Sequence, residues 1–532
     1  MKRILERYPV AAVMALMFLC LAPVMAMRDF TPANELRYLS IADEALRDGH
    51  VFAFTNHGLA YADKPPLYLW IIMLCRLVFG RHSMFALSLF SFIPAMTIIG
   101  VMDRWMCGDR GVFDRKFTPG ERAGAALLLG TSGLFLGMSV FLRMDMMMCM
   151  WIVLSLYSFS KDRPWAYAVF TFLALFTKGP VGILAPLLSV LVWLLVSGRR
   201  RELGKWFGWR TWLVLGLGCI VWFGGVYLDG GAPYLENLLV HQTVGRAVNS
   251  FHHKAPWWYY GVSIWEVMAP WCLATVPALV VALLRRKGGL WGWSALTTFI
   301  MLSCFSSKIA IYLAPVFPLV AYVFPVVAAE GYKGWMKAAL AVPGVIFILV
   351  GAAVFTAGTF WGPVCSLLSS HGLDLSAYSF AGSPLLSLAG LALIAGGVLG
   401  IIGVRKAWHR AVIPPAAGLL VAIFFASWLM PAINDFVGYG NLCKAVPEGA
   451  DVYTWKVYRP ENIDVYLGRE VVNLEEASET ASASQGEAHT ITTAEEALGA
   501  VPAGSVLITK TKYLPDASGE TVGEYVIIGK TL

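Results

Sequence analysis

Apolar and polar positions alternate along this chain on the scale of whole segments. Runs of about 17–25 apolar residues, the length of a helix that crosses a bilayer, are separated by short charged connections. About thirteen such runs are expected, near residues 8–26, 83–102, 123–142, 145–160, 164–177, 180–197, 211–228, 262–284, 290–305, 309–328, 338–360, 385–403 and 411–430. The pattern predicts an all-α polytopic membrane protein.

The positive charges of the connections predict an orientation. Lysines and arginines gather in every second connection, as in Arg199-Arg-Arg201 and Arg285-Arg-Lys287, and such connections stay in the cytoplasm. The N-terminus is therefore expected in the cytoplasm of a bacterial inner membrane, with 27–82, 229–260 and the tail in the periplasm. The first run, after Met1-Lys-Arg, has features of a cleaved signal peptide; we interpret it as the first anchor because the alternation requires one there.

The composition agrees with this class and excludes others. Hydrophobic residues make up 58% and charged residues 14% of the 532 residues. The net charge of +7 lies in the connections, where it sets orientation, so we do not expect nucleic acid as a partner. The nine cysteines form no CxxC pair, which argues against a zinc site or a disulfide framework. No Walker A or dinucleotide motif occurs, so no nucleotide cofactor is expected.

The composition changes after Pro431, which divides the chain into a transmembrane domain, 1–430, and a soluble periplasmic domain, 431–532. Residues 493–499 read as a capped helix. Short β-rich segments, expected as strands, lie at 451–455, 464–468, 470–474, 505–509 and 524–529. A small α/β domain is predicted, which we interpret as a lid or scaffold.

The first external loop, 27–82, contains a predicted helix that lies on the membrane surface. Thr31 is expected to cap it and Gly49 to end it. On this helix Asn34 and Arg37 share a face, with Glu35 beside them. Such a face is also typical of an ordinary solvated interfacial helix. The helix has an apolar stripe, formed by Leu36, Leu39, Ala42 and Leu46.

Asp63 and Lys64 follow in the same loop, before two prolines that hold the backbone extended and fix the direction of both side chains. The apolar stretch from Leu67 to Gly80 is too short to cross the bilayer and is expected along the interface.

Further charged residues stand at the external ends of later runs. Lys178 and Lys308 are either snorkelling anchors or site residues, because both lie near span ends. Asp145 differs, since a short carboxylate side chain cannot reach water and needs a partner. The segment Trp257-Trp-Tyr-Tyr260 reads as an interfacial aromatic belt.

Several cations and a few carboxylates are thus expected around one external cavity. This combination suits a lipid-linked phosphate leaving group, whose charge the cations take up, and a carboxylate that activates or orients an acceptor. The alternative is a polytopic transporter or flippase of a lipid-linked or anionic substrate, which places its charges near mid-span. Convergence of Asp63, Lys64 and Asp145 at the external interface would favour the transferase.

The motifs resemble those of the GT-C membrane glycosyltransferases of the aminoarabinose (lipid A) transferase and protein O-mannosyltransferase type. Asn34-Glu-Leu-Arg-Tyr38 is similar to the family's Asp-Glu-x-Arg-Tyr motif, and Tyr61-Ala-Asp-Lys-Pro-Pro-Leu-Tyr-Leu-Trp70 to its Glu-Lys-Pro-Pro-Leu-Tyr-x-Trp motif. Similar later segments are Arg143-Met-Asp145, Thr177-Lys-Gly-Pro180, Trp257-Trp-Tyr-Tyr260, and Ser307-Lys308 with Tyr312. The resemblance therefore covers the membrane part of the chain.

The resemblance implies a polyprenyl-phosphate sugar donor, transfer of a pentose or hexose with inversion on the periplasmic side, and lipid A, a glycan or a protein as acceptor. It places Arg37 and Lys64 on the donor phosphate, with Lys308 and Tyr312 assisting. Asp63 and His241 match a possible divalent-metal position.

One departure concerns the catalytic residues. Asn34 stands where the family has Asp and cannot accept a proton. A hydroxyl acceptor needs a general base, whereas a phosphate acceptor is already anionic. Either Glu35 or Asp145 is therefore the base, or the acceptor needs none.

Overall fold

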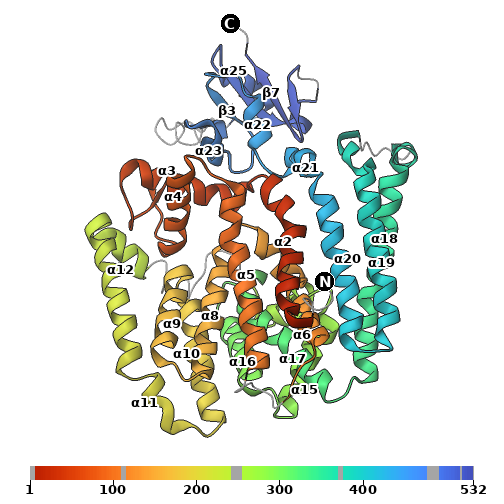
Figure 1. Cartoon of the computed structure of the whole chain (residues 1–532). Helices are drawn as coiled ribbons and strands as arrows, with labels where there is room; N and C mark the ends of the chain where they lie inside the picture. The colour runs from red at the N-terminus through yellow and green to blue at the C-terminus, as the bar shows by residue number, and fades with distance from the viewer. Residues whose placement is uncertain are drawn as a thin grey trace.

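The computed structural model describes residues 6–108, 115–240, 254–369, 376–475, 491–515 and 518–530. A bundle of helices forms the membrane part, and a small sheet lies beyond one end of it, above α2 and α5 (Figure 1). Each predicted apolar run contains one helix or two consecutive helices. They are α2 (Pro9–Met27), α5 (Met84–Cys107), α6 (Pro119–Gly130), α7 (Gly133–Val140), α8 (Met144–Ser160), α9 (Pro164–Lys178), α10 (Pro180–Val196), α12 (Trp209–Glu236), α14 (Tyr259–Val267), α15 (Cys272–Leu284), α16 (Gly289–Cys304), η4 (Ala310–Val316), α17 (Phe317–Ala329), α18 (Gly334–Ser369), α19 (Pro384–Val404) and α20 (Trp408–Ser427).

Seven helices of the described ranges are long and apolar enough to cross a membrane, or eight if the bent pair α6 and α7 is one span. Other apolar helices, among them α8, α10, α15 and α16, are shorter. The helical membrane class is thus confirmed, while the total of thirteen spans stays a prediction. Many helices carry prolines or glycines near their ends, which shortens the regular segments without changing their apolar character.

The bend between α6 and α7 measures 74° and has a local cause. Thr131 and Ser132 turn their hydroxyls back onto the carbonyls of Leu127 and Leu128, at 2.6 and 2.8 Å. These bonds compete with the backbone ladder and bend helices. The bend sends α7 toward the sheet end of the bundle, where residues 141–143 connect it to α8.

The first external loop forms a π-helical turn, η1 (Pro32–Leu36), followed by α3 (Arg37–Asp48), a short hairpin of β1 (Thr55–Asn56) and β2 (Leu59–Ala60), and α4 (Leu67–Phe79). Gly49 ends α3 at a φ of 79°, as predicted. Thr31 does not cap the helix; its hydroxyl donates instead to the Glu35 carboxylate at 2.9 Å. Leu36, Leu39 and Ala42 of the predicted apolar stripe are buried and Leu46 is half-buried. Helix α3 also contacts the C-terminal part through α23 (Asp464–Leu467).

The C-terminal part, which the sequence predicts to be soluble, contains a mixed five-stranded sheet with the order β4-β3-β5-β7-β6. The segment 464–468, predicted as a strand, is the helix α23: Pro460 starts a 3₁₀ turn that runs directly into it, and Gly468 ends it at a φ of 64°. The other predicted elements are present. The bounds are α21 (Met430–Val437), α22 (Gly440–Ala445), β3 (Val452–Thr454), β4 (Val472–Asn473), α25 (Ala494–Ala500), β5 (Val506–Lys510), β6 (Glu520–Val522) and β7 (Tyr525–Gly529).

Candidate active site

A buried ion pair joins two of the segments that the sequence singled out. Lys178 donates through Nζ to Oδ1 of Asp145, whose residue is only 2% exposed. The ammonium group also lies 4.6 Å from the centre of the Tyr312 ring, a cation–π distance. Asp145 lies in the first turn of α8 and Lys178 in the last turn of α9, so each helix dipole stabilises the charge at its end. Lys178 therefore points into the protein and is not a snorkelling anchor.

Tyr38 brings the first external loop to the same place. Its side chain is buried, and burial raises the pKa of its hydroxyl to about 12. The negative charge of Asp145 adds to this increase in pKa, while the cations Arg37 and Arg143 oppose it. Electrostatic effects of this size need short distances. The start of α3 and the start of α8 therefore face one another around Tyr38.

Arg37 is a cation of the first loop, and its hydrogen-bond partner Asn34 is neutral. Its Nη2 donates to Oδ1 of Asn34 at 3.3 Å, and its guanidinium lies 5.9 Å from the ring centres of both Tyr38 and Tyr61. Its Nε is buried without a hydrogen-bond partner among the residues of the described ranges. A buried hydrogen-bond donor without a partner costs free energy. An anion such as a phosphate would supply the missing acceptor.

Asp63 and Lys64 lie at the end of the hairpin, before Pro66 and α4. Both side chains are half-buried and engaged in interactions within the protein. Asp63 acts electrostatically on Tyr234, whose hydroxyl donates to the carbonyls of Phe54 and Tyr61 at 3.1 and 2.7 Å. The end of α12 therefore supports this part of the loop.

Lys308 is buried next to the end of α16. Its Nζ donates to the carbonyls of Ala255, at 3.1 Å, and Phe305. These bonds tie the end of α16 to the segment before α14. A pocket of about 680 Å³ opens beside Lys308. Its walls are mainly apolar, formed by Trp257, Trp258, Gly261, Phe299, Ile300, Ser303, Cys304, Phe305 and Ser306.

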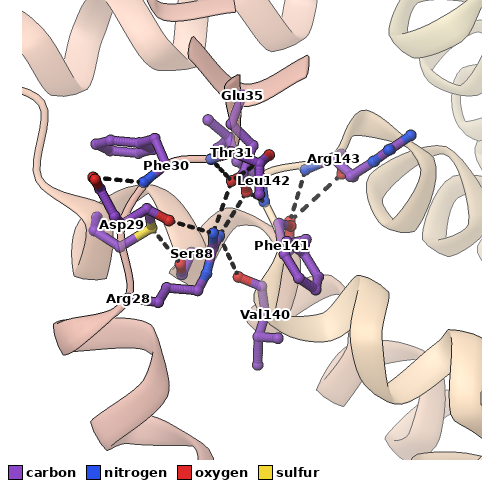
Figure 2. A network of polar contacts seen from close by, with 12 residues as sticks. Arg28, Asp29, Phe30, Thr31, Glu35, Ser88, Val140, Phe141, Leu142 and Arg143 are labelled. Atoms are coloured by element: carbon purple, nitrogen blue, oxygen red, sulfur yellow. Dashed lines mark hydrogen bonds and ion pairs between the residues drawn. The ribbon is translucent and has the colours of Figure 1, made fainter. Parts of the chain in front are cut away.

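A second buried ion pair, between Arg28 and Glu35, underlies the first loop (Figure 2). Two parallel hydrogen bonds of 2.7 and 2.6 Å join the guanidinium to the carboxylate. Glu35 also accepts from the backbone N–H and the hydroxyl of Thr31, at 2.8 and 2.9 Å, and from the N–H of Leu142, at 2.6 Å. Arg28 donates further to the carbonyl of Val140 at 3.1 Å.

The structure brings together Asn34, Arg37, Asp145 and Tyr312 of the predicted site residues. It places Lys308 on backbone carbonyls and Glu35 within the Arg28 pair. Sequence reasoning missed Arg28, Tyr38 and Arg143 as members of the site. Arg28 directly follows the first apolar run, where a cation is typical of an ordinary flanking charge. The sequence signal for its pairing was its position seven residues before Glu35.

The expected metal position is only partly described. Among the residues of the described ranges, no group of three or more His, Cys, Asp and Glu side chains is arranged to hold a metal ion. Asp63 is half-buried near Tyr234, and His241 lies outside the described residues. One carboxylate alone does not supply the ligand set of a divalent cation.

Comparison of the sequence with known proteins supports the resemblance. No family model matches the chain. An undecaprenyl phosphate-α-4-amino-4-deoxy-L-arabinose arabinosyl transferase of Pseudomonas fluorescens is 25% identical over 298 residues, which are 53% of this chain and 50% of that protein. The protein of the same name from Edwardsiella ictaluri is 25% identical over 356 residues, 62% and 61% of the two chains. The chain spans about half the length of the first of these relatives in the sequence match.

The likeness in structure extends over nearly the whole chain. ArnT from Cupriavidus metallidurans bound to undecaprenyl phosphate superimposes with a TM-score of 0.70 at 18% identity, covering 98% of this chain and 96% of that one. The apo state of the same protein gives a TM-score of 0.67. The chain therefore has the GT-C fold of ArnT, and its apolar helices and relatives indicate a multi-span protein of a bacterial inner membrane.

Proposed function

We propose that this chain is a membrane glycosyltransferase that moves a sugar from a polyprenyl-phosphate donor to an acceptor at the periplasmic face, with inversion at the sugar carbon. The convergence of Arg37, Arg143, Lys178 and Asp145 around Tyr38 carries the proposal. Departure of a lipid phosphate develops negative charge, which buried cations stabilise far better than water does. The named relatives make a 4-amino-4-deoxy-L-arabinose donor the first candidate.

Arg37 is proposed as the principal phosphate ligand. Because Asn34 is neutral, it does not cancel the charge of Arg37. The buried Nε of Arg37 is a hydrogen-bond donor that has no acceptor among the described residues. Lys64, from the Asp-Lys-Pro-Pro segment, and Tyr312, beneath Lys178, are proposed to assist. For Lys308 we propose a role at the rim of the apolar pocket, whose aromatic walls suit part of the polyprenyl chain.

Asp145 is the proposed general base for a hydroxyl acceptor. Its carboxylate is held at the start of α8 by Lys178, whereas the carboxylate of Glu35 already accepts hydrogen bonds from Arg28, Thr31 and Leu142. A base needs a free lone pair directed at the acceptor. With a phosphate acceptor no base is needed, and Asp145 would orient the acceptor through Lys178.

The position of the cluster favours transfer over transport. Arg37 belongs to the first loop, which lies at the end of the bundle that carries the sheet (Figure 1), and Asp145 with Lys178 meets this loop around Tyr38. A transporter binds its substrate near the middle of the bilayer, at broken helices. A divalent metal at Asp63 and His241 stays a separate hypothesis.

The test is a transfer assay with the purified full-length protein. Undecaprenyl-phosphate-linked 4-amino-4-deoxy-L-arabinose is supplied with lipid A, and the products are identified by mass spectrometry. We expect modified lipid A from the wild-type protein and at least a ~100-fold lower rate from Asp145→Asn. A wild-type protein that transfers no sugar but moves labelled lipid across a vesicle bilayer would contradict the proposal in favour of a flippase.

A further inference from the structure

The Arg28–Glu35 pair joins two parts of the chain that carry different halves of the cluster. Arg28 follows α2, and Glu35 lies in η1, directly before the Arg37 and Tyr38 of α3. Both partners reach across to the connection between α7 and α8, at the carbonyl of Val140 and the N–H of Leu142. Asp145, in the first turn of α8, follows Leu142 by three residues. The pair therefore links Arg37, the proposed ligand of the donor phosphate, to Asp145, the proposed base.

The connection that it holds has no regular structure of its own. Phe141 and Arg143 are extended, with ψ values of 147° and 127°. Ser91 of α5 accepts from the N–H of Arg143 at 3.4 Å and donates to the carbonyl of Phe141 at 2.7 Å. The ion pair and Ser91 together bind four backbone groups of this segment. The groups of Val140 and Leu142 are buried and would have no partner without the ion pair.

We propose that Arg28 and Glu35 are positioning residues that fix the distance between the Asn34–Arg37 face and Asp145, and that Glu35 is not the general base. Arg28 is 5% and Glu35 1% exposed, so the two charges exist only as a pair. The fork of the guanidinium supplies two parallel bonds and sets the orientation as well as the distance. A displacement of about 1 Å between reacting groups costs roughly 100-fold in rate. The inference deepens the proposed function and uses its transfer reaction as one of two readouts.

The first readout compares Glu35→Gln with the double variant Arg28→Met, Glu35→Gln. The single variant leaves the Arg28 charge buried without a counter-charge, and we expect kcat to fall roughly 10- to 100-fold. The double variant removes that charge but also lacks the guanidinium fork, so we expect its kcat to stay at least ~10-fold below the wild-type value, while the stability lost in the single variant is largely recovered. The acidic limb of the pH–rate profile should be the same in both variants as in the wild type. Loss of the acidic limb in either variant would identify Glu35 as the base, and a double variant with the wild-type kcat would show that the pair does not position the reacting groups; either result would overturn the inference.

Arg28→Lys covers the case in which Glu35→Gln does not fold. Lysine keeps the charge but not the fork, and we expect kcat to fall about 10-fold with little change in KM. An unchanged kcat would contradict the positioning role of Arg28 and Glu35. The matched control is Arg122→Lys. Arg122 of α6 forms a similar two-bond pair, of 2.9 and 2.6 Å, with Asp103 near the end of α5. This control should keep kcat per folded molecule.

The second readout needs no substrate. It therefore tests the positioning role of Arg28 and Glu35 separately from the proposed function. Hydrogen exchange of the Glu35→Gln protein should become faster in peptides covering 29–37 and 140–145 together, and stay unchanged in the sheet of the soluble part. Faster exchange in only one of the two segments would show that the pair does not couple them. If the wild-type protein transfers no sugar, the exchange result alone decides the inference.

Discussion

Asn34 and Arg37 show how one side-chain atom changes the electrostatics of the proposed phosphate site. The amide oxygen of Asn34 accepts one bond from Arg37 without neutralising it. An aspartate at this position would form an ion pair in a half-buried setting, and an ion pair reduces the attraction of the guanidinium for a second anion.

We therefore expect Asn34→Asp to raise the KM for the donor roughly 3- to 10-fold, a change of the size that a partly screened ion pair produces. The rate kcat should stay near the wild-type value, because Asp145 already serves as the proposed base. Asn34→Ala is the control and should leave KM within about twofold. An increase of kcat in Asn34→Asp would show instead that Asp145 is not an effective base in the wild-type protein.

The Asp145–Lys178 pair gives a prediction about stability. Lys178→Met leaves a buried carboxylate without its counter-ion, which costs about 3–5 kcal/mol, and thermal unfolding in detergent should show a clear fall in Tm. The double variant Lys178→Met, Asp145→Asn should recover most of it. Lys205→Met, which breaks the exposed pair with Asp162, is the control and should change the free energy of unfolding by less than about 1 kcal/mol. Equal losses in the single and double variants would contradict pairing.

At the scale of elements, short helices meeting end to end build the cluster. α8 begins, α9 ends and α3 begins within reach of one another, so helix termini supply partial charges that favour Asp145 and Lys178. Gly179 makes the turn from α9 to α10 at φ 87° and ψ −146°, a conformation that residues with a Cβ rarely adopt. This turn sets the direction in which Lys178 points.

Gly179→Ala is expected to destabilise the protein by about 1–3 kcal/mol, through backbone strain alone, because no atom lies within 4 Å of an added Cβ. The matched control is Gly216→Ala inside α12, where the space around a Cβ is also open and alanine favours a helix by up to about 1 kcal/mol. Chemical denaturation of both variants checks the difference. Equal stability of the two would rule out strain at Gly179.

At the scale of the whole molecule, the soluble part is docked on the segment that precedes the cluster. The Asp29 carboxylate accepts from the N–H of Gly440 at 2.6 Å and from the hydroxyl of Tyr466. Asn462 donates to the carbonyl of Pro32 at 2.9 Å. The sheet and the first loop therefore lie on the same side of the membrane part, as Figure 1 shows.

This shared side leads to a prediction about topology. A reporter that is active only in the periplasm, fused after Leu532, should be active, because the basic connections place the first loop outside. A cytoplasmic reporter at the same point should be inactive. The opposite result would place the proposed site in the cytoplasm.

The docking surface also predicts a dependence on pH. Asp464 accepts from Ser40 at 3.3 Å and lies 3.7 Å from His57. Burial raises its pKa to about 6, Asp43 acts in the same direction, and His57 opposes them. The folded protein therefore binds a proton that the unfolded chain, with its lower pKa, has released between about pH 4 and 6. The stability that this proton contributes is lost as the pH rises through that window.

Asp464→Asn should remove this loss and raise stability at pH 7.5 by at most about 3 kcal/mol, with little effect below about pH 4. Thermal unfolding from about pH 4 to 8 measures it. Asp451→Asn, an exposed carboxylate of the same soluble part, is the control and should follow the wild-type curve. A wild-type Tm that does not fall between about pH 4 and 7 would contradict this role of Asp464.

The order of the elements was determined largely by the sequence. Apolar runs predicted the helices because crossing a bilayer demands length and hydrophobicity from each segment independently. Gly49, with its left-handed backbone, was likewise predictable from local chemistry. Where two local signals competed, as at 464–468, alternation suggested a strand, but Pro460 and Gly468 favoured one helical turn.

Only the tertiary structure decided which charges meet. Asp145 and Lys178 are 33 residues apart, and Glu35 and Leu142 are 107 apart. Hydropathy reports whether a segment enters the membrane, but not how it is rotated or which neighbour it packs against. Glu35 and Asp145 were therefore equal candidates for the base in the sequence, and became different through their partners. A buried carboxylate takes its role from the donors around it, and those donors come from distant parts of the chain.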